Sequence, residues 1–249
     1  MSMTGYVAFD LGAESGRAML VMLDGDRVTL AEAHRFANLP QRLPSGYHWN
    51  LLQLWADLLE GLTNAGEIAR QRGVNLVSLG VDTWGVDFGL VGKSGQLLGL
   101  PFAYRDERSS PAFAKAIDQV GEQAIYDATG IQFLRFNTLY QLIAQRDGEP
   151  AALDHADRLL HMPDLLHYFF TGEKVHEATI ASTAQMVDPH TGEWATKLLE
   201  QLGLPAHMLG RIVPAGTRIG VLRDEVARQA NVEPIDVIAP GSHDTASAV

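Results

Sequence analysis

The order of elements at the N-terminus is the feature that most constrains how this chain can fold. Residues 6–9 and 17–23 are apolar segments of strand length, and the turn between them, residues 10–16, contains two glycines. A second turn at 24–26 leads into residues 28–33, which form another strand-like segment. The chain therefore predicts three antiparallel strands, joined by tight turns, before any helix begins.

A helix and two further strands follow a loop at 39–49. Apolar residues recur at intervals of three and four after Asn50, a residue type that commonly caps helices, and this helix should end near Gly73. Residues 76–81 and 86–91 are apolar segments typical of buried strands. This order of hairpins, helix and further strands predicts a mixed sheet.

The second half of the chain is expected to be mainly helical. Short helical patterns interrupted by glycine and proline run through 110–209, which indicates helical material inserted beside the sheet. Residues 224–230 favour another helix, and 235–239 favour a last strand. That strand leads into 241–245, the position at which open α/β sheets usually bind ligands. The predicted fold class is α/β, a mixed sheet flanked by helices with a helical insertion.

Composition excludes several classes of protein. The 249 residues carry 19 Lys and Arg against 30 Asp and Glu, a net charge of −11, and no basic patch, so we expect no nucleic-acid partner. The chain has no cysteine, which excludes disulfides, zinc–thiolate sites and thiol nucleophiles. It shows neither a signal-peptide pattern nor an apolar run of membrane length. We therefore expect a soluble, cytoplasmic protein without a membrane partner.

Two patterns resemble functional motifs but have simpler explanations. Residues 92–94 match the end of a Walker A loop, yet Asp87 stands where an earlier glycine is required and no helix follows directly. We interpret these residues as a hairpin turn. The spacing of the histidines does not match a metal site, because the second histidine of H-E-x-x-H is missing. Surface or helix-packing roles are predicted for His155, His161, His167 and His176.

The turn at 10–16 is the first candidate for chemistry. Its two glycines would let the backbone approach a ligand and adopt positive φ, while Ser15 and the turn amides would donate to phosphate oxygens. Asp10, at the end of a strand, is placed to hold Mg²⁺ directly or through water, and Arg17 adds positive charge. The alternative is an ordinary glycine-containing turn with a solvated aspartate.

Residues 80–88 are the second candidate, because two aspartates, a threonine and a tryptophan interrupt an otherwise buried strand. Polar groups buried without partners each cost about 1–3 kcal/mol, so these groups need partners. A sugar would supply them: carboxylates accept from hydroxyls, the Trp84 ring covers an apolar sugar face, and Gly85 lets the ligand approach the backbone. Alternatively, they bond neighbouring loops. Residues 104–108 add charges to the wall of the same cleft or to a surface cluster.

The third candidate is residues 241–247, which follow the last predicted strand. Asp244 would open a helix, whose dipole keeps the carboxylate ionised and able to accept a proton or to orient a hydroxyl. The alternative is a helix N-cap, a very common role for aspartate and serine. Spacing alone does not distinguish these roles.

Taken together, these segments resemble the FGGY family of sugar kinases. The resemblance rests on D-L-G-A-E-S-G-R at 10–17, D-T-W-G-V-D-F at 82–88 and S-H-D-T-A-S-A-V at 242–249. It also rests on A-Y-R-D at 103–106 and on several residues of 130–142. The segments occur in order over nearly the whole chain, and together they are far more specific than a single phosphate loop.

The resemblance implies an actin-like, ribonuclease-H-like ATPase fold, with residues 1–249 as the N-terminal, sugar-binding domain. It implies ATP and Mg²⁺ as cofactors, with Asp10 helping to hold the metal and Asp244 acting as the general base. The residues implied to contact ATP phosphates are Ala13, Glu14, Ser15, Gly16 and Arg17. Those implied to contact the sugar are Gly85, His243, Asp244 and Thr245.

The implied reaction transfers phosphate from ATP to the 1-hydroxyl of a ketose, with L-rhamnulose expected first and L-fuculose or L-xylulose as alternatives. Family members are longer than this chain, so we expect the C-terminal nucleotide-binding domain to lie outside it. A single-domain sensor of sugar or nucleotide is the non-enzymatic alternative. Glu14 departs from the small polar residue usual in such hairpins. The interpretation requires the carboxylates of Asp10 and Asp244 to face one crevice.

Overall fold

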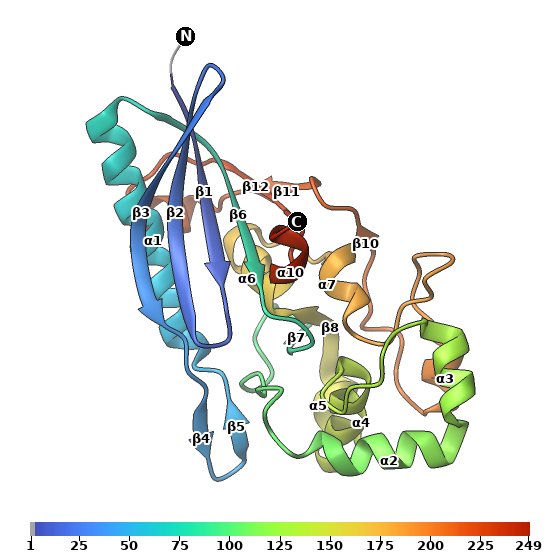
Figure 1. Ribbon diagram of the computed structural model, residues 1–249. Coiled ribbons are helices and arrows are strands. Elements are labelled where there is room, and N and C mark those ends of the chain that lie inside the picture. The colour runs from blue at the N-terminus through green and yellow to red at the C-terminus, as the bar shows by residue number, and fades with distance from the viewer. Residues whose placement is uncertain (1–2) are drawn as a thin grey trace.

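The computed structural model describes residues 3–249 and is built around a six-stranded mixed sheet (Figure 1). The strands lie in the order β11-β12-β6-β1-β2-β3. Their bounds are β1 (Thr4–Leu11), β2 (Ser15–Asp24), β3 (Arg27–Ala37), β6 (Asn75–Thr83), β11 (Arg218–Val221) and β12 (Asp236–Ile238). β6 runs parallel to β1 and β12, and the other neighbours are antiparallel. The predicted mixed sheet and its three opening antiparallel strands are confirmed.

One face of the sheet carries the main core, because side chains alternate between the two faces of each strand. On β1, Val7 and Phe9 are buried on this face. Helices α1 (Leu51–Arg72) and α6 (Met162–Thr171) cover it. The rings of Phe9 and Phe170 stack with their centroids 5.9 Å apart, so the sheet and α6 share one core.

Helix α1 begins and ends where the sequence predicts. The side chain of Asn50 accepts a hydrogen bond from the backbone amide of Gln53 at 3.3 Å, which caps the first turn. Gly73 closes the helix in the left-handed conformation, with φ of 64°. Near the middle of the helix, a Cβ on Gly61 would lie 2.6 Å from the Cβ of Ala18, so only glycine permits this close approach to β2.

The opposite face of the sheet presents polar side chains. Asp10 and Asp82 are register partners in the parallel pair β1–β6, and Arg17 lies opposite Asp10 in the antiparallel pair β1–β2. These three side chains therefore project to the same face at the same end of the sheet. Helix α10 (Asp244–Ser247) lies over this face next to β6 (Figure 1).

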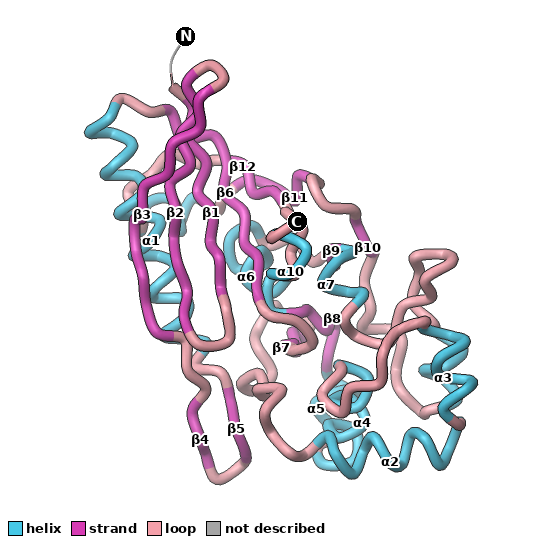
Figure 2. Tube along the Cα trace, viewed as in Figure 1, coloured by secondary structure: helices cyan, strands magenta, loops and turns pink. Residues whose placement is uncertain are grey.

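A second, mainly helical part of the chain lies beside the sheet (Figure 2) and has its own buried apolar cluster. It is built on the two-stranded sheet of β7 (Phe88–Gly92) and β8 (Ala156–His161). The helices between β7 and Gln201 are α2 (Ser109–Val120), α3 (Glu122–Thr129), α4 (Thr138–Gly148), α5 (Pro150–His155), α6, α7 (Ala178–Ser182) and α8 (Thr196–Gln201). The predicted helical insertion is confirmed. None of the helices in residues 3–249 is both long and apolar enough to cross a bilayer.

The structure differs from the sequence predictions in two ways: one predicted strand leaves the main sheet, and short strands occur where none were predicted. The strand expected at 86–91 does not join the main sheet, because Val86 has φ of 69° and turns the chain away after β6. The expected loop at 39–49 contains a hairpin of β4 and β5, and a second short pair joins β9 to β10. These strands are β4 (Gln41–Leu43), β5 (Gly46–His48), β9 (His176–Glu177) and β10 (Ile212–Val213), too short to show a pattern.

Candidate active site

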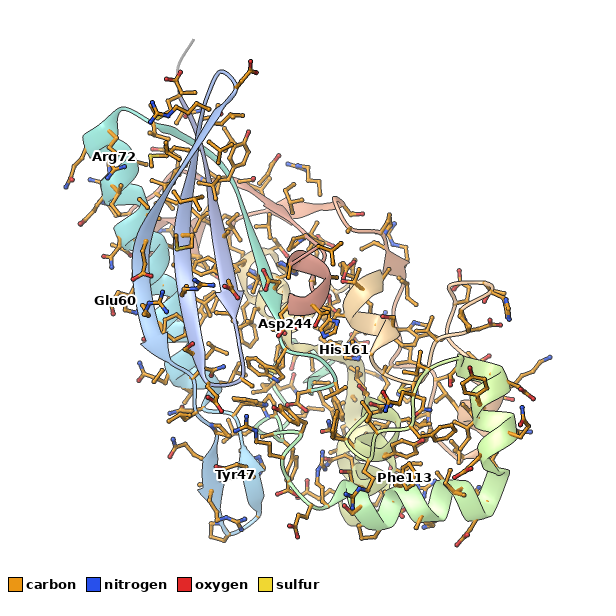
Figure 3. All side chains as sticks on the ribbon, viewed as in Figure 1. Tyr47, Glu60, Arg72, Phe113, His161 and Asp244 are labelled. Carbon is orange, nitrogen blue, oxygen red and sulfur yellow. The ribbon has the colours of Figure 1, made fainter. Side chains whose placement is uncertain are left out.

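Three carboxylates from separate elements meet in one crevice on the polar face of the sheet. Asp10 lies near the end of β1, Asp82 near the end of β6, and Asp244 at the start of α10. All three line a hollow of about 750 Å³ together with Arg17 and Ser247. Figure 3 labels Asp244 on α10, in front of the sheet. The expectation that Asp10 and Asp244 face one crevice is confirmed, and their chemical roles stay predictions.

Arg17 places a positive charge beside the carboxylates. Its guanidinium donates to Oδ2 of Asp10 from Nε at 3.1 Å and also from Nη2. The two side chains are 45% and 40% exposed, so the pair adds no more than about 1 kcal/mol to stability. Its more important consequence is positional, because the guanidinium stays in the crevice, where an anionic ligand would meet it.

Asp82 is the carboxylate most affected by its neighbours. Burial, followed by the negative charges of Asp10 and Asp244, raises the pKa of Asp82 to about 7, although a hydrogen bond with Ser247 opposes the shift. Crowded carboxylates of this kind favour a bound cation, and oxygen ligands suit Mg²⁺. The sequence analysis grouped Asp82 with residues for a sugar. The parallel register of β1 and β6 pairs it with Asp10 instead.

The turn between β1 and β2 is built differently from the prediction. The expected positive φ is wrong for Gly12 and Gly16, since neither glycine adopts it. A Cβ on Gly16 would lie 2.3 Å from the ring of Phe36, so packing against β3 is what requires this glycine. Asn38, which the sequence analysis missed, holds the turn. Its side-chain amide donates to the carbonyl of Gly12 at 2.8 Å, and its backbone amide donates to the carbonyl of Glu14 at 2.9 Å.

The residues predicted to contact ATP phosphates follow this turn into β2. Ser15 and Gly16 begin β2, where they pair with the end of β3. The carboxylate of Glu14 accepts a hydrogen bond from the guanidinium of Arg105 at 3.3 Å, and both side chains are exposed. Arg105 therefore balances the negative charge by which this turn departs from the family pattern. Ala13 lines a second hollow.

This second hollow, of about 450 Å³, is mainly apolar and is joined to the crevice by Asp244, which lines both. Ile131, Leu134 and Phe136 form much of its apolar wall, from the segment between α3 and α4. Tyr104 also lines the hollow, which agrees with the first of the two roles expected for residues 104–108, the wall of the cleft. The hollow therefore combines apolar walls with one carboxylate at its junction with a polar crevice.

Of the residues predicted to contact the sugar, Gly85, His243 and Asp244 line this hollow, and Thr245 does not. A Cβ on Gly85 would lie 3.3 Å from Nε2 of His243 and 3.3 Å from Cγ2 of Thr183, so glycine leaves the space open. Nε2 of His243 lies 3.3 Å from Oδ1 of Asp244. Thr245 donates to the same oxygen through its amide (2.6 Å) and its hydroxyl (3.1 Å), which orients the carboxylate.

The second aspartate of the 82–88 segment serves the fold. The carboxylate of Asp87, 1% exposed, accepts hydrogen bonds from the indole N–H groups of Trp49 at 2.6 Å and Trp84 at 3.0 Å. The side-chain amide of Gln141 and the backbone amide of Tyr104 donate to it at 2.8 and 3.0 Å. Burial nevertheless raises the pKa of Asp87 to about 6. Its donors come from four places in the chain. Asp87 therefore bonds neighbouring segments of the protein, the alternative to sugar binding that the sequence left open.

Comparison with known sequences decides the family. Residues 5–249 match the N-terminal domain of the FGGY family of carbohydrate kinases. The chain belongs to this family. Rhamnulokinase from Bacteroides thetaiotaomicron is 41% identical over 244 residues, which are 98% of this chain and 50% of that protein. Rhamnulokinase from Pectobacterium atrosepticum is 42% identical over 251 residues, 100% of this chain and 49% of that protein. The chain thus spans about half the length of the curated relatives it matches.

Solved structures share the fold of this FGGY domain. A gluconate kinase from Lactobacillus acidophilus superposes with a TM-score of 0.84 at 15% identity, over 95% of this chain and 47% of that chain. A xylulose kinase from the same organism superposes with a TM-score of 0.82 at 15% identity, over 94% of this chain and 47% of that chain. At such low identity the likeness shows the fold alone. The predicted actin-like ATPase fold is confirmed.

In this FGGY domain, residues that the sequence analysis missed support the 241–244 segment from behind. The buried carboxylate of Glu177 accepts hydrogen bonds from the backbone amides of Ile180 and Ser242, both at 3.1 Å. The hydroxyl of Thr179 accepts from the backbone amide of His243 at 3.2 Å. No local pattern marks Glu177, because its contact with Ser242 spans 65 residues of chain.

Surface or helix-packing roles were predicted for four histidines of the FGGY domain, and two of the four show one of these roles. His155 is exposed, whereas His161, His167 and His176 are fully buried. Nε2 of His167 accepts a hydrogen bond from the backbone amide of Val81 at 3.2 Å, which joins α6 to β6. This is the packing role expected of it.

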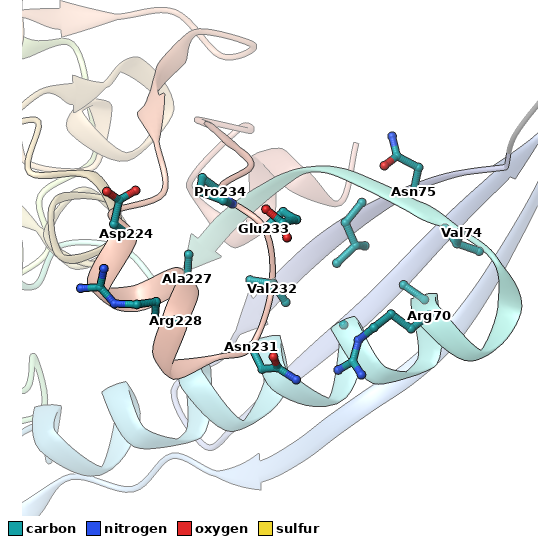
Figure 4. Close-up of a pocket in the computed structure, with 13 residues that line it drawn as sticks. Arg70, Val74, Asn75, Asp224, Ala227, Arg228, Asn231, Val232, Glu233 and Pro234 are labelled. Atoms are coloured by element: carbon teal, nitrogen blue, oxygen red, sulfur yellow. The ribbon is translucent and has the colours of Figure 1, made fainter.

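Another hollow of the FGGY domain lies between the C-terminal half of α1 and helix α9 (Asp224–Gln229), as Figure 4 shows. It encloses about 620 Å³, and Arg70, Arg228 and Glu233 are among its charged residues. None of the predicted site residues lines it. The carboxylate crevice and its adjoining hollow are therefore the candidate active site.

Proposed function

We propose that the protein containing this chain transfers phosphate from ATP to the 1-hydroxyl of L-rhamnulose, a step of rhamnose breakdown. The relatives named rhamnulokinase support this substrate. The observation that carries the proposal is the position of Asp244, which lines both the carboxylate crevice and the apolar hollow. A hydroxyl held in the hollow would thereby meet a carboxylate and a phosphate donor at one point.

Asp244 would orient the 1-hydroxyl and accept its proton. Phosphoryl transfer passes through a loose transition state, so the attacking hydroxyl needs alignment more than a strong base. The hydrogen bonds from Thr245 and the adjacent ring of His243 fix one oxygen of the Asp244 carboxylate. The other oxygen would then be directed to the sugar, while Gly85 leaves room for it.

Asp10 and Asp82 would hold Mg²⁺, directly or through water, because their carboxylates share one crevice with that of Asp244 and a cation would relieve the repulsion between these charges. When bound, Mg²⁺ would screen the negative charge of the phosphates. Arg17 and the backbone amides of Ala13 to Gly16 would donate hydrogen bonds to the phosphate oxygens of ATP.

The apolar wall of the hollow fits a deoxy sugar. L-rhamnulose carries a methyl group where L-xylulose has none and where many ketoses have a hydroxymethyl group. Ile131, Leu134 and Phe136 would cover this methyl group without leaving a polar group unpaired. L-fuculose has the same methyl group, so the hydroxyl stereochemistry must separate these two sugars.

We also propose that residues 1–249 act as the sugar-binding half of a two-domain kinase. The chain spans about half the length of its relatives, which supports a second domain that carries the adenine contacts. Closure of the two domains on the sugar would exclude water and limit hydrolysis of ATP.

A substrate panel tests the proposal. ADP release by the protein, including any residues beyond Val249, would be measured with L-rhamnulose, L-fuculose, L-xylulose and D-gluconate. We expect the highest kcat/KM with L-rhamnulose. A clear preference for another ketose would identify that sugar as the substrate. Sugar binding without ADP release from any ketose would instead support the sensor alternative.

A further inference from the structure

A second group of possible metal ligands lies outside the carboxylate crevice. His161 ends β8, Asp164 lies in the first turn of α6, and His176 begins β9. All three side chains are 0% exposed. Nδ1 of His161 lies 3.7 Å from Oδ2 of Asp164, and Nδ1 of His176 lies 3.5 Å from the same oxygen. One ligand atom from each residue fits within a group no more than 4.8 Å across.

The facing atoms of this group have no hydrogen-bond partner among residues 3–249. They are Nδ1 of His161, Oδ2 of Asp164 and Nδ1 of His176. Nε2 of His176, on the far side of its ring, also has no partner there. The other oxygen of Asp164 is satisfied, because it accepts from the backbone amide of Glu177 at 3.0 Å. Buried polar atoms without partners are rare in folded proteins. Three of them facing one another indicate that something else completes the cluster.

The contacts of Thr138 indicate which nitrogen of His161 carries the proton. The hydroxyl of Thr138 donates its only proton to the carbonyl of Val86 at 2.6 Å. Its contact with Nε2 of His161, at 3.5 Å, is therefore favourable only when Nε2 is the donor. A neutral imidazole then has its lone pair on Nδ1, facing the carboxylate of Asp164. A cation between these two electron-rich atoms would stabilise this arrangement.

We propose that His161, Asp164 and His176 bind a Zn²⁺ ion. Two imidazoles and one carboxylate favour Zn²⁺ over Mg²⁺, which prefers oxygen ligands. Ligand atoms about 2.1 Å from a tetrahedral zinc lie about 3.4 Å apart. The distances of 3.5 and 3.7 Å from Oδ2 of Asp164 to the two ring nitrogens are close to this separation. The ligands come from three elements, so no H-E-x-x-H spacing reveals them.

The ion would stabilise the fold behind the sugar hollow. It would join the β8–α6 junction to β9, and β8 and β9 belong to separate two-stranded sheets. Glu177 follows His176 directly and holds the backbone of Ser242, next to His243. Because no ligand atom is exposed, the ion would enter while the chain folds rather than by exchange in the native state. This inference does not depend on the identity of the sugar.

The test is metal analysis of the protein, produced without a polyhistidine tag and dialysed against a chelator. We expect close to one zinc per chain by mass spectrometry. Protein produced in cobalt-supplemented minimal medium should show the visible absorption of tetrahedral Co²⁺. His176→Gln and Asp164→Asn should abolish both signals, whereas His190→Gln, at an exposed histidine, should leave both unchanged.

Wild-type protein decides the question even when a variant fails to fold. Refolding from denaturant with Zn²⁺ should give a higher Tm than refolding with chelator. Metal-free native protein with the same Tm in both conditions and no cobalt spectrum would overturn the proposal. The cluster would then be a hydrogen-bonded histidine–aspartate–histidine group. Zinc retained equally by His176→Gln would also overturn it, because the ion would lie elsewhere.

Discussion

At the scale of single residues, Asp244 tests the proposed chemistry most directly. In the longer protein that carries the second domain, Asp244→Asn keeps the shape of the side chain and removes its ability to accept a proton. We expect kcat to fall by about 10²–10⁴-fold, the usual contribution of a general base, with little change in the KM for the sugar. Steady-state ADP release measures both. Asp26→Asn, at an exposed hairpin turn, is the matched control. Turnover of Asp244→Asn close to wild type would remove Asp244 from this role.

Asp82 gives a prediction about pH, because its folded pKa of about 7 lies above the value of 3.8 in an unstructured chain. Between these values the folded state keeps a proton that the unfolded state has lost. Asp82 therefore contributes stability at low pH that disappears as the pH rises through about 7. The Tm of the wild type minus that of Asp82→Asn should fall between about pH 4 and about pH 7 and level off above that range.

Thermal unfolding of both proteins at each pH measures this difference. Added Mg²⁺ should reduce its pH dependence, because a bound cation favours the ionised carboxylate. A difference in Tm that stays constant with pH would contradict the role assigned to burial and to the charges of Asp10 and Asp244. A pH dependence that Mg²⁺ leaves unchanged would separate the titration of Asp82 from metal binding.

At the scale of elements, the two ends of α1 were predictable because their signals are local. Asn50 and Gly73 act within one turn of the helix, so neighbouring residues determine their effect. Gly73→Ala would force a side chain into the left-handed conformation and should destabilise the protein by about 1 kcal/mol. Gly148→Ala, at the end of α4 where φ is negative and a Cβ meets nothing, should cause no loss. Urea unfolding measures the change in the free energy of unfolding for both variants. Equal changes would contradict the view that the left-handed conformation at the end of α1 requires glycine.

Elements that depend on distant contacts were not predictable in the same way. The sequence analysis identified β7 as a strand but assigned it to the main sheet. Its actual direction follows from Val86, whose backbone turns sharply, and from Asp87, whose donors come from four separate segments. The two-residue strands β9 and β10 carry no periodicity at all. Pairing between distant segments decides both cases.

The candidate site shows the same division. Asp10, Gly85 and Asp244 were identified from motifs, and the structure brings them to adjoining hollows. Asn38 and Glu177, which hold the motifs in position, were missed because each bonds a segment far away in the sequence. Motifs thus reveal groups that face a ligand more readily than the residues that support them.

At the scale of the whole molecule, the site lies where two separately packed parts meet. One buried cluster joins the sheet to α1 and α6, and another fills the helical part. The apolar hollow takes Ala13, Trp84 and His243 from the sheet side and Ile131 and Phe136 from the helical side. A change in how the two parts pack would therefore alter the hollow directly, while the carboxylate crevice belongs to the sheet and α10 alone.

This division predicts how the 249 residues behave when they are produced by themselves. The apolar hollow that we propose for the sugar is formed within these residues, so calorimetry should detect weak binding of L-rhamnulose. Turnover needs ATP to be held in line and water to be excluded, and the crevice of Asp10, Asp82 and Asp244 opens to solvent. We expect no ADP release above background, whereas a longer protein with the second domain should restore it. Robust turnover by the 249 residues would show that the crevice holds ATP without a second domain.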